Sequence, residues 1–266
     1  MPELEALLHL AVEAAEGAGA LLKRREDEAR VTVEHKSSLT DMVTEMDRAA
    51  EAFVVKRLHG ARPNDGFLGE EGSLRSGSSG VRWIIDPLDG TTNYLYGFPA
   101  YTVSIAAEVD GAPAVGAVHD PSHGETFTAI AGRGAWCNGR LLSVAGATTL
   151  ATALVATGFS YVAERRAWQA EVLARVMPSV RDVRRAGAAS LDLCWLAAGR
   201  VDVYYERGLQ PWDYAAGALV AAEAGAEVTD LDGGPPSTAI TIAAAPTIAA
   251  DFRALLADAE AGVGAP

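Results

Sequence analysis

The chain has 266 residues, 49% of them hydrophobic, which is enough for a folded, enzyme-sized protein with a substantial core. Its formal net charge of −13 at pH 7 disfavours direct binding to nucleic acids or membranes, so any phosphate that it binds must be recruited locally, for instance by metal ions between carboxylates. Two unpaired cysteines, a start without the pattern of a secretory signal and apolar runs too short to span a membrane predict a cytoplasmic protein without structural zinc.

The first half of the chain predicts two helices followed by an antiparallel sheet. Apolar residues recur at helical spacing over residues 3–25, and a second helix with Phe53 on its apolar face is expected after a polar break at 35–40. The Gly- and Ser-rich segment 73–80 predicts an exposed loop. Strands are then expected at 81–85, 101–108, 112–118 and 125–130.

From about residue 150 the pattern changes to alternating strands and helices. No repeat or disordered linker separates the two parts of the chain. We therefore predict one α+β catalytic domain over 1–266, with an α+β half over about 1–145 and an α/β half over about 146–266. In the second half, strands are expected at 153–157, 180–184, 201–205, 226–229 and 240–244, and helices at 163–177, 188–198, 214–224 and 247–257.

The segment 86–93, with the sequence DPLDGTTN, directly follows the predicted strand 81–85 and has the strongest chemical signal in the chain. Two aspartates separated by two residues, with a proline stiffening the backbone between them, can direct both carboxylates and a carbonyl toward one point. Hard divalent cations bind such oxygen ligands. Gly90 and Thr91 offer N–H groups in a turn that would open a helix, which suits a phosphate oxygen. An ordinary Asp-Gly turn is the alternative, but it does not require the first aspartate, the proline or the asparagine.

The segment 86–93 resembles the signature of the inositol monophosphatase family, which consists of metal-dependent, lithium-sensitive sugar phosphatases. Further blocks in the same order are similar to that family's pattern, namely residues 41–47 (DMVTEMD), 69–71 (GEE), and 204–206 (YYE) with 212–217 (WDYAAG). The resemblance extends over essentially the whole chain. It implies a layered αβαβα sandwich of the sugar phosphatase type and a homodimer.

The resemblance also implies two or three Mg²⁺ ions in each active site. One ion would be held by Glu70, Asp86 and the backbone carbonyl of Leu88. A second would share Asp86 and add Asp89 and Asp213, and a third, weaker ion beside Glu70 would be completed largely by water. Paired ions about 3.5 to 4 Å apart can stabilise both the attacking and the leaving oxygen of an in-line displacement. Asp213 has an alternative interpretation to ion binding. It would lie at the start of a helix, where the helix dipole favours a carboxylate.

By the same resemblance, Asp47, Thr91 and Glu70 are the catalytic residues. The Thr91 hydroxyl would pass a proton from the attacking water toward Asp47. Asp47 has a second interpretation, because Thr44 and Asp47 are spaced as a capping box in which the carboxylate accepts a backbone N–H at the start of a helix. The two roles are compatible. Lys36 and its polar neighbours would form a mobile loop that closes over the ions.

The resemblance further implies a group of substrate-binding residues. Glu206, at the end of a predicted strand, would bind hydroxyl groups of the substrate, and an exposed charge is the alternative interpretation. The backbone around Gly187 would also contact the substrate. The full group is Asp89, Gly90, Thr91, Gly187, Ala189, Glu206 and Asp213.

The resemblance therefore implies Mg²⁺-dependent hydrolysis of a small phosphate monoester by activated water, with inositol 1-phosphate as the expected substrate. Similar proteins act on fructose 1,6-bisphosphate, adenosine 3′,5′-bisphosphate or histidinol phosphate, and these substrates are alternatives with the same chemistry. A hypothesis of another class is a binding partner of the transcription or ribosome-assembly machinery. The complete set of carboxylates argues against a purely structural role, and the acidic charge argues against direct RNA binding.

Overall fold

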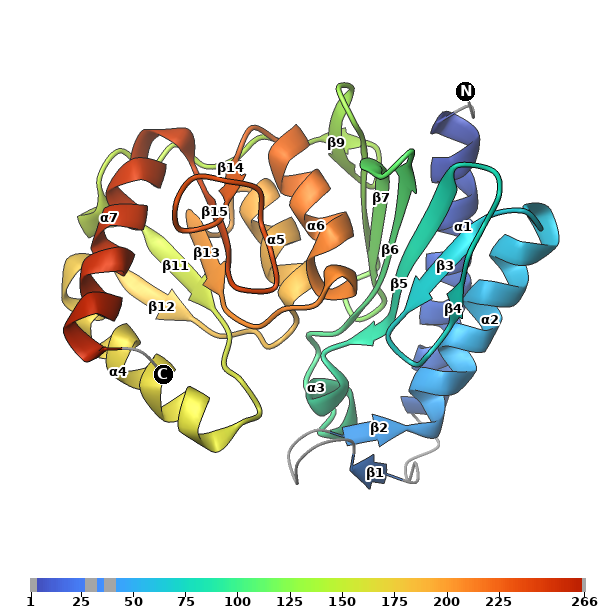
Figure 1. Ribbon diagram of the computed structural model, residues 1–266, viewed down its shortest axis with the longest axis horizontal. Helices are drawn as coiled ribbons and strands as arrows, with labels where there is room; N and C mark the ends of the chain where they lie inside the picture. Colours follow the sequence, from blue (N-terminus) through green and yellow to red (C-terminus); the bar gives the residue numbers. More distant parts are fainter. Residues whose placement is uncertain (1–3, 27–32, 36–41, 265–266) are drawn as a thin grey trace.

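The computed structural model describes residues 4–26, 33–35 and 42–264. Figure 1 shows its layers in order: the helix pair α1 and α2, a large sheet, the pair α5 and α6, a smaller sheet, and the pair α4 and α7. The expected layered α+β sandwich is therefore confirmed. Lys36 of the predicted mobile loop and Asp41 of the first sequence block lie outside the described residues.

The first layer consists of α1 (Leu4–Glu26) and α2 (Glu45–Ala61), and both were predicted. Gly17 of α1 lies against the ring of Phe53 on α2, where an added Cβ would overlap the ring, so glycine permits the close approach of the two helices. Fully buried residues of α1 recur at spacings of three and four, as expected for a helix that packs one face on a sheet. They are Leu7, Ala11, Ala14, Ala15, Ala18 and Leu22.

The large sheet has the strand order β10-β9-β8-β7-β6-β5-β3-β4, and its neighbours are antiparallel except for the parallel pair β3 and β5. One face packs against α1 and α2, and the other packs against α5 and α6. Its strands are β3 (Gly66–Gly69), β4 (Leu74–Arg75), β5 (Val81–Asp89), β6 (Thr102–Val109), β7 (Ala112–Asp120), β8 (Glu125–Ile130), β9 (Gly134–Cys137) and β10 (Arg140–Leu141).

Two details predicted for this sheet were wrong. The strand expected at 81–85 continues as β5 to Asp89, because the chain stays beside β6 while their pairing becomes irregular between Asp86 and Asp89. Such an irregularity accommodates Pro87, which has no N–H for a regular ladder. The segment 73–80, expected to be a loop throughout, contains the short strand β4, which pairs with β3.

The smaller sheet has the order β12-β11-β13-β15-β14, and β12, β11 and β13 are parallel. The predicted alternation of strands and helices is confirmed, although α6 begins at Pro211 instead of residue 214. The strands are β11 (Leu154–Thr157), β12 (Asp182–Arg184), β13 (Val203–Glu206), β14 (Glu227–Thr229) and β15 (Thr241–Ala244). The helices are α4 (Ala163–Val176), α5 (Ala189–Ala197), α6 (Pro211–Glu223) and α7 (Pro246–Val263).

The remaining elements are short. They are the antiparallel pair β1 (Val33–His35) and β2 (Met42–Thr44), helix α3 (Thr91–Leu95), and 3₁₀ turns at Leu150–Thr152 and Met177–Ser179.

The middle helices α5 and α6 belong to two hydrophobic cores. One side of the pair packs on the large sheet and the other on the smaller sheet. We propose on this basis that the two halves of the chain form a single domain. Within the described part of the chain, no helix combines the length and the apolar character needed to cross a membrane.

Candidate active site

The motif 86–93 folds as the end of β5 followed at once by α3. The Leu88 N–H donates to Asp86 Oδ1 at 3.0 Å, where β5 loses its regular pairing with β6. Gly90 has a φ of 93°, and an added Cβ would lie 2.8 Å from the carbonyl oxygen of Ala100, so both backbone conformation and space require glycine. The Thr91 hydroxyl then donates back to the Leu88 carbonyl at 3.1 Å. This compact turn holds the motif's polar groups at one end of the strand.

Helix α2 brings Asp47 to the same turn. Asp47 is buried in the first turn of α2, and its Oδ1 lies 3.4 Å from the Thr91 hydroxyl oxygen. That hydroxyl has one proton and two acceptors, the Asp47 carboxylate and the Leu88 carbonyl, so it can donate fully to only one of them. Two of the three predicted catalytic residues, Asp47 and Thr91, therefore lie in contact with each other. The side chain of Thr44, the other half of the predicted capping box, lies outside the described part of the structure.

Glu70 reaches the site because β3 runs parallel to β5 and ends beside Ile85, the residue before the motif. Gly69 is paired with Ile85, and the Glu70 N–H donates to the Ile85 carbonyl at 3.1 Å. Asp86 is the next residue of β5. The carboxylates of Glu70 and Asp86 are distant in sequence, but they therefore lie beside each other, one just after β3 and the other on β5.

Asp89 connects the large sheet to the middle layer. Its Oδ2 accepts the Ser190 N–H at 2.7 Å and the Ser190 hydroxyl at 2.6 Å, while Oδ1 accepts the Ala189 N–H at 3.3 Å. Ala189 and Ser190 begin α5, whose N-terminal N–H groups have no partner within the helix. The carboxylate of Asp89 thus caps α5 and holds the preceding Gly187 segment near the motif.

Asp213 lies in the first turn of α6 and forms a capping box with Gln210. Its Oδ2 accepts the Gln210 N–H at 2.6 Å. The predicted position at the start of a helix is therefore confirmed. The same carboxylate also faces the other acidic residues of the site, so capping and ion binding do not exclude each other.

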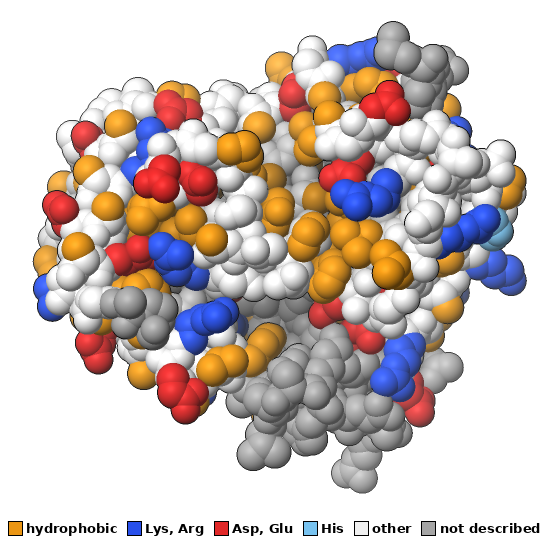
Figure 2. All heavy atoms as spheres, viewed as in Figure 1, with side chains coloured by type: hydrophobic (Ala, Val, Ile, Leu, Met, Phe, Trp, Pro, Cys, Tyr) orange, Lys and Arg blue, Asp and Glu red, His pale blue; other side chains and the backbone are white. Residues whose placement is uncertain are grey.

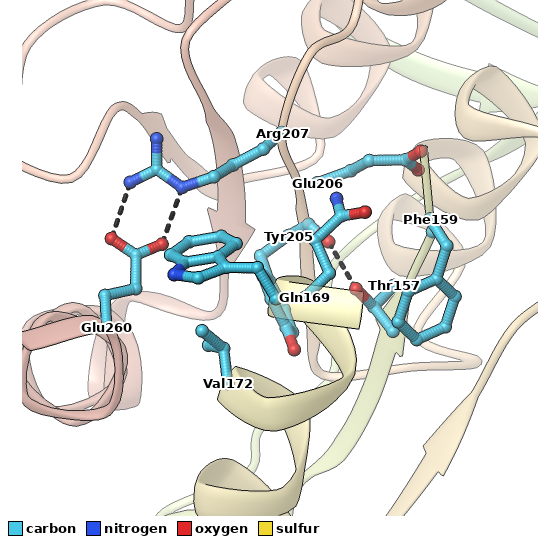
Figure 3. Close-up of a pocket in the computed structure, with 10 residues that line it drawn as sticks. Thr157, Phe159, Gln169, Val172, Tyr205, Glu206, Arg207 and Glu260 are labelled. Carbon is cyan, nitrogen blue, oxygen red and sulfur yellow. Dashed lines mark hydrogen bonds and ion pairs between the residues drawn. The ribbon is translucent and has the colours of Figure 1, made fainter. Parts of the chain in front are cut away.

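Glu206 ends β13 and is half-buried instead of exposed, which contradicts the alternative interpretation. The Tyr204 hydroxyl donates to Glu206 Oε2 at 2.9 Å. A Cβ at Gly158 would overlap the Glu206 carboxylate. Figure 3 shows Glu206 extending toward the segment that carries Phe159. Burial raises the pKa of Glu206 to about 7.

These residues border one open cleft of about 580 Å³, and Asp47 reaches it through Thr91. Every residue of the predicted metal and substrate sets lies on its lining, namely Glu70, Asp86, Leu88, Asp89, Gly90, Thr91, Gly187, Ala189, Glu206 and Asp213.

Five further lining residues were not predicted. Among the residues of this lining, Arg185 is the only cation, and its position two residues before Gly187 is the one signal in the sequence that could have identified it. The others are supplied by the loop after β11 and by the chain before α6, where no motif marks them. The five are Gly158, Phe159, Tyr161, Arg185 and Leu209.

The carboxylates of the cleft repel one another. Burial raises the pKa of Asp86 well above its usual range, and the charge of Glu70 raises it further. Burial also raises the pKa of Asp213, with Asp89 as the next cause. The pKa of Asp89 itself is raised to about 6 by burial, although hydrogen bonds from Ser190 oppose the rise. A divalent cation between such groups relieves the repulsion.

The cleft has the donor chemistry of a hard cation site. Within the described residues, no three His, Cys, Asp or Glu side chains already stand close enough to form a complete ligand set. The carboxylates and the Leu88 carbonyl are nevertheless the oxygen donors that Mg²⁺ prefers. Backbone N–H groups engage Asp86 Oδ1 and Asp213 Oδ2, and each carboxylate has a second oxygen to offer. Asp86 and Asp213 can therefore each offer an oxygen to a cation while keeping the backbone hydrogen bond.

The layered fold and the carboxylate cleft define a metal-dependent phosphatase. The chain belongs to the inositol monophosphatase family, whose model matches residues 3–260.

Individual relatives agree with this assignment. The chain is 48% identical over 236 residues to the inositol-1-monophosphatase SuhB of Mycobacterium tuberculosis, with 84% of this chain and 81% of that protein covered. It is 43% identical over 231 residues to the Nus factor SuhB of Vibrio cholerae, with 86% of each covered. The crystal structure of the extragenic suppressor protein SuhB from Bartonella henselae matches with a TM-score of 0.90 at 39% identity, covering 94% of this chain and 98% of that one.

Proposed function

We propose that this protein hydrolyses inositol 1-phosphate to inositol and inorganic phosphate with bound Mg²⁺. The observation that carries the proposal is the convergence of acidic side chains from distant parts of the chain on one cleft. The mycobacterial relative named inositol-1-monophosphatase supports the choice of substrate. The converging side chains are Glu70, Asp86, Asp89, Glu206 and Asp213.

Two ions would be held by the residues that surround the end of β5. Glu70, Asp86 and the Leu88 carbonyl fit one ion, and Asp86, Asp89 and Asp213 fit a second, with room for a third beside Glu70. Bound Mg²⁺ would neutralise the phosphate dianion and stabilise the leaving oxygen.

Thr91 and Asp47 would remove a proton from the attacking water. The Thr91 hydroxyl oxygen accepts a proton from the water while its own proton moves to Asp47 Oδ1, which lies 3.4 Å away. General base catalysis of this kind contributes about 10²- to 10⁴-fold to a rate. The N–H groups of Gly90 and Thr91 would bind phosphate oxygens at the start of α3.

Glu206 would bind the hydroxyl groups of the inositol ring. Its carboxylate is held by the Tyr204 hydroxyl and borders the same cleft as Gly187 and Ala189, whose backbone would complete the contact with the ring. A carboxylate accepts hydrogen bonds from hydroxyl groups, so this arrangement favours a polyol as the group that carries the phosphate.

The test is a panel of phosphate esters ranked by kcat/KM, assayed with and without Mg²⁺ and with added Li⁺. Inositol 1-phosphate should be preferred over fructose 1,6-bisphosphate, adenosine 3′,5′-bisphosphate and histidinol phosphate. Removal of Mg²⁺ should abolish turnover, and Li⁺ should inhibit it. A wide preference for the nucleotide bisphosphate would contradict the proposed substrate, and full activity without divalent ions would contradict the mechanism.

A second proposed function is binding to the transcription machinery, which the relative named Nus factor SuhB favours. On the face in Figure 2, acidic and basic side chains of the described residues are interspersed, without a continuous field of Lys and Arg, which fits a protein partner better than a nucleic acid. A pulldown with wild type and with Asp86→Asn separates the two functions. Recovery of polymerase subunits by both proteins would support binding independent of catalysis, and recovery by neither would exclude it.

We also propose that the protein is a cytoplasmic homodimer. Large apolar side chains are exposed near the cleft, with Tyr96 at 76% and Phe98 at 54% exposure, and Tyr96 and Tyr161 line a hollow beside it. An apolar surface of this kind fits a subunit contact. Light scattering should give twice the chain mass of 27.7 kDa. A mass of one chain at micromolar concentration would contradict the dimer.

A further inference from the structure

Glu51 is a buried carboxylate of α2 that takes no part in the reaction proposed above. Its side chain is only 3% exposed. It accepts two backbone hydrogen bonds, from the Glu71 N–H to Oε2 at 2.8 Å and from the Ser73 N–H to Oε1 at 3.0 Å. Both oxygens of the carboxylate are therefore directed at the turn that follows β3, which is the turn that carries Glu70.

This turn is also held from its other sides. The Gly69 N–H donates to the Ser73 carbonyl at 2.8 Å, and the Glu70 N–H donates to the Ile85 carbonyl at 3.1 Å. A Cβ at Gly69 would overlap the carboxylate of Glu51, so the carboxylate packs directly against the backbone before Glu70 and bonds to the backbone after it. The position of Glu70 is thus determined by β5 on one side and by Glu51 on the other.

Helix α2 carries a second functional carboxylate one turn before Glu51. Asp47 and Glu51 are four residues apart and face the same side of the helix, and both are buried. Asp47 reaches the Thr91 hydroxyl, while Glu51 reaches the turn of Glu70. One rigid helix turn therefore connects the residues that handle water with a residue that would hold an ion.

We propose that Glu51 is a positioning residue for the divalent ion: it fixes the Glu70 turn and thereby sets the affinity for Mg²⁺. The inference rests on the proposed function, because it requires Glu70 to be an ion ligand. Glu51 itself does not touch the ion. Loss of a residue that orients a metal ligand typically weakens metal binding by about 10- to 100-fold.

The test compares wild type with Glu51→Gln and Glu51→Asp in the full-length protein. The glutamine has one acceptor oxygen, so it loses one of the two backbone bonds and turns an NH₂ group toward an N–H. The aspartate keeps both carboxylate oxygens, but its side chain is shorter by one methylene group, so the oxygens lie farther from the turn. Glu51→Asp provides the test if Glu51→Gln does not fold.

The control is Asp65→Asn. Asp65 is an equally buried carboxylate just before β3. It accepts hydrogen bonds from Trp83 Nε1 at 2.9 Å and Ser79 Oγ at 2.6 Å and pairs with Arg62, and none of these partners belongs to the turn of Glu70.

Two readouts do not depend on activity. Calorimetric titration should give a Mg²⁺ dissociation constant about 10-fold higher in Glu51→Gln, with a smaller increase in Glu51→Asp. Amide hydrogen exchange should become faster at Glu71 and Ser73 in both variants. Asp65→Asn should lower the melting temperature and leave the dissociation constant unchanged. Activity of Glu51→Gln should recover at high Mg²⁺, with little change in the KM for the ester.

The inference falls if Glu51→Gln and Glu51→Asp bind Mg²⁺ as tightly as wild type, or if Asp65→Asn weakens binding equally. A wild type that binds Mg²⁺ but hydrolyses no ester would contradict the proposed function and leave the role of Glu51 standing. A wild type that binds Mg²⁺ and hydrolyses inositol 1-phosphate, with a Mg²⁺ dissociation constant that neither Glu51→Gln nor Glu51→Asp changes, would overturn the role of Glu51 alone.

Discussion

Gly158 lies where the chain leaving β11 passes the carboxylate of Glu206. β11 ends at Thr157, and a Cβ at the next residue would overlap both carboxylate oxygens of Glu206. Gly158 does not have a positive φ, so glycine is required there for space and not for backbone conformation. The position of Glu206 in the cleft thus depends on the absence of a side chain at Gly158 as well as on the hydrogen bond from the Tyr204 hydroxyl.

Replacing Gly158 by alanine should therefore impair substrate binding more than folding. The methyl group displaces Glu206, and loss of one hydrogen bond from a substrate hydroxyl to a charged group costs about 1.5 kcal/mol, or roughly 10-fold in the KM for inositol 1-phosphate. Steady-state kinetics and thermal melts check this. The control is Gly60→Ala near the end of α2, where a Cβ meets nothing within 4 Å. An unchanged KM in Gly158→Ala would contradict the proposed role of Glu206.

Glu206 should also make the metal-free protein less stable as the pH rises. Burial raises the pKa of Glu206 to about 7 in the folded protein, against 4.5 for an unperturbed glutamate, so the folded state binds the proton more tightly than the unfolded state. The protonated Glu206 therefore adds to the free energy of unfolding. This contribution is complete below pH 4.5 and is lost as the pH rises through 7. Because Glu206 is half-buried, we expect a loss of about 1 kcal/mol.

Glu206→Gln removes this titration. In EDTA, the melting temperature of the variant relative to wild type should therefore be higher at pH 8 than at pH 5. The difference between the two proteins then contains the titration of Glu206 together with its repulsion of Asp192 and Asp213. A difference that stays constant over this range would show that the pKa of Glu206 is not raised.

At the scale of elements, the contact between Asp89 and the start of α5 joins two layers of the fold. Asp89 accepts the N–H and the hydroxyl of Ser190, and that hydroxyl also lies 2.7 Å from Thr102 Oγ1 on β6. The two bonds from Ser190 lower the pKa of Asp89 against the effect of burial. The start of α5 thus keeps Asp89 ionised at a lower pH than burial alone would permit.

Ser190→Ala should shift the acid side of the pH–activity profile upward. Loss of the hydroxyl bond raises the pKa of Asp89, so a smaller fraction of Asp89 is ionised at a given pH, and the expected shift is about half to one pH unit. The profile is measured at a fixed, subsaturating Mg²⁺ concentration. Ser104→Ala is the control, because Ser104 is buried on β6 and its hydroxyl donates to the Trp212 carbonyl instead. Equal shifts in both variants would contradict the role of Ser190.

The elements differ in how far their sequence predicts them. The long helices and the strands of six or more residues have a periodic apolar pattern, and they were predicted to within a few residues. Strands β3, β4, β9 and β10 have two to four residues each and were missed, and they exist because a neighbouring strand offers its edge. Strands β11 to β15 are as short, but their alternation with helices marks them in the sequence. The continuation of β5 to Asp89 was missed for a related reason, because Pro87 normally ends a strand unless the pairing is irregular.

At the scale of the whole molecule, the cleft is assembled from every inner layer. β3 and β5 supply Glu70 and Asp86, while α6 supplies Asp213 from the opposite side. Their convergence could be expected from the resemblance of the motifs to a family, but not from spacing, since Glu70 and Asp213 meet only through the packing of the layers. Gly158 lies outside any motif and could be found only in the folded chain, whereas the one sequence signal for Arg185 is its position two residues before Gly187.

A site of this kind should make the stability of the whole molecule depend on divalent ions. Without an ion, the raised pKa values of Asp86, Asp89 and Asp213 mean that ionisation of these groups opposes folding, increasingly so as the pH rises. We expect Mg²⁺ to bind the ionised groups in the folded state alone and to connect the large sheet with α6. We therefore expect stabilisation of about 2.7 kcal/mol at a Mg²⁺ concentration 100 times the dissociation constant, and more at pH 8 than at pH 6, where protons compete for the same oxygens.

Thermal melts over a series of MgCl₂ concentrations measure this effect, with NaCl at equal ionic strength as the control. The control is needed because the chain carries a net charge of −13, so salt of any kind reduces self-repulsion and stabilises the fold to some extent. Only specific binding produces a rise in melting temperature that continues with the logarithm of the Mg²⁺ concentration and disappears in Asp86→Asn. If NaCl stabilised the protein as much as MgCl₂ did, the carboxylates would be responding to screening alone, and the cleft would not hold the ions that the proposed reaction requires.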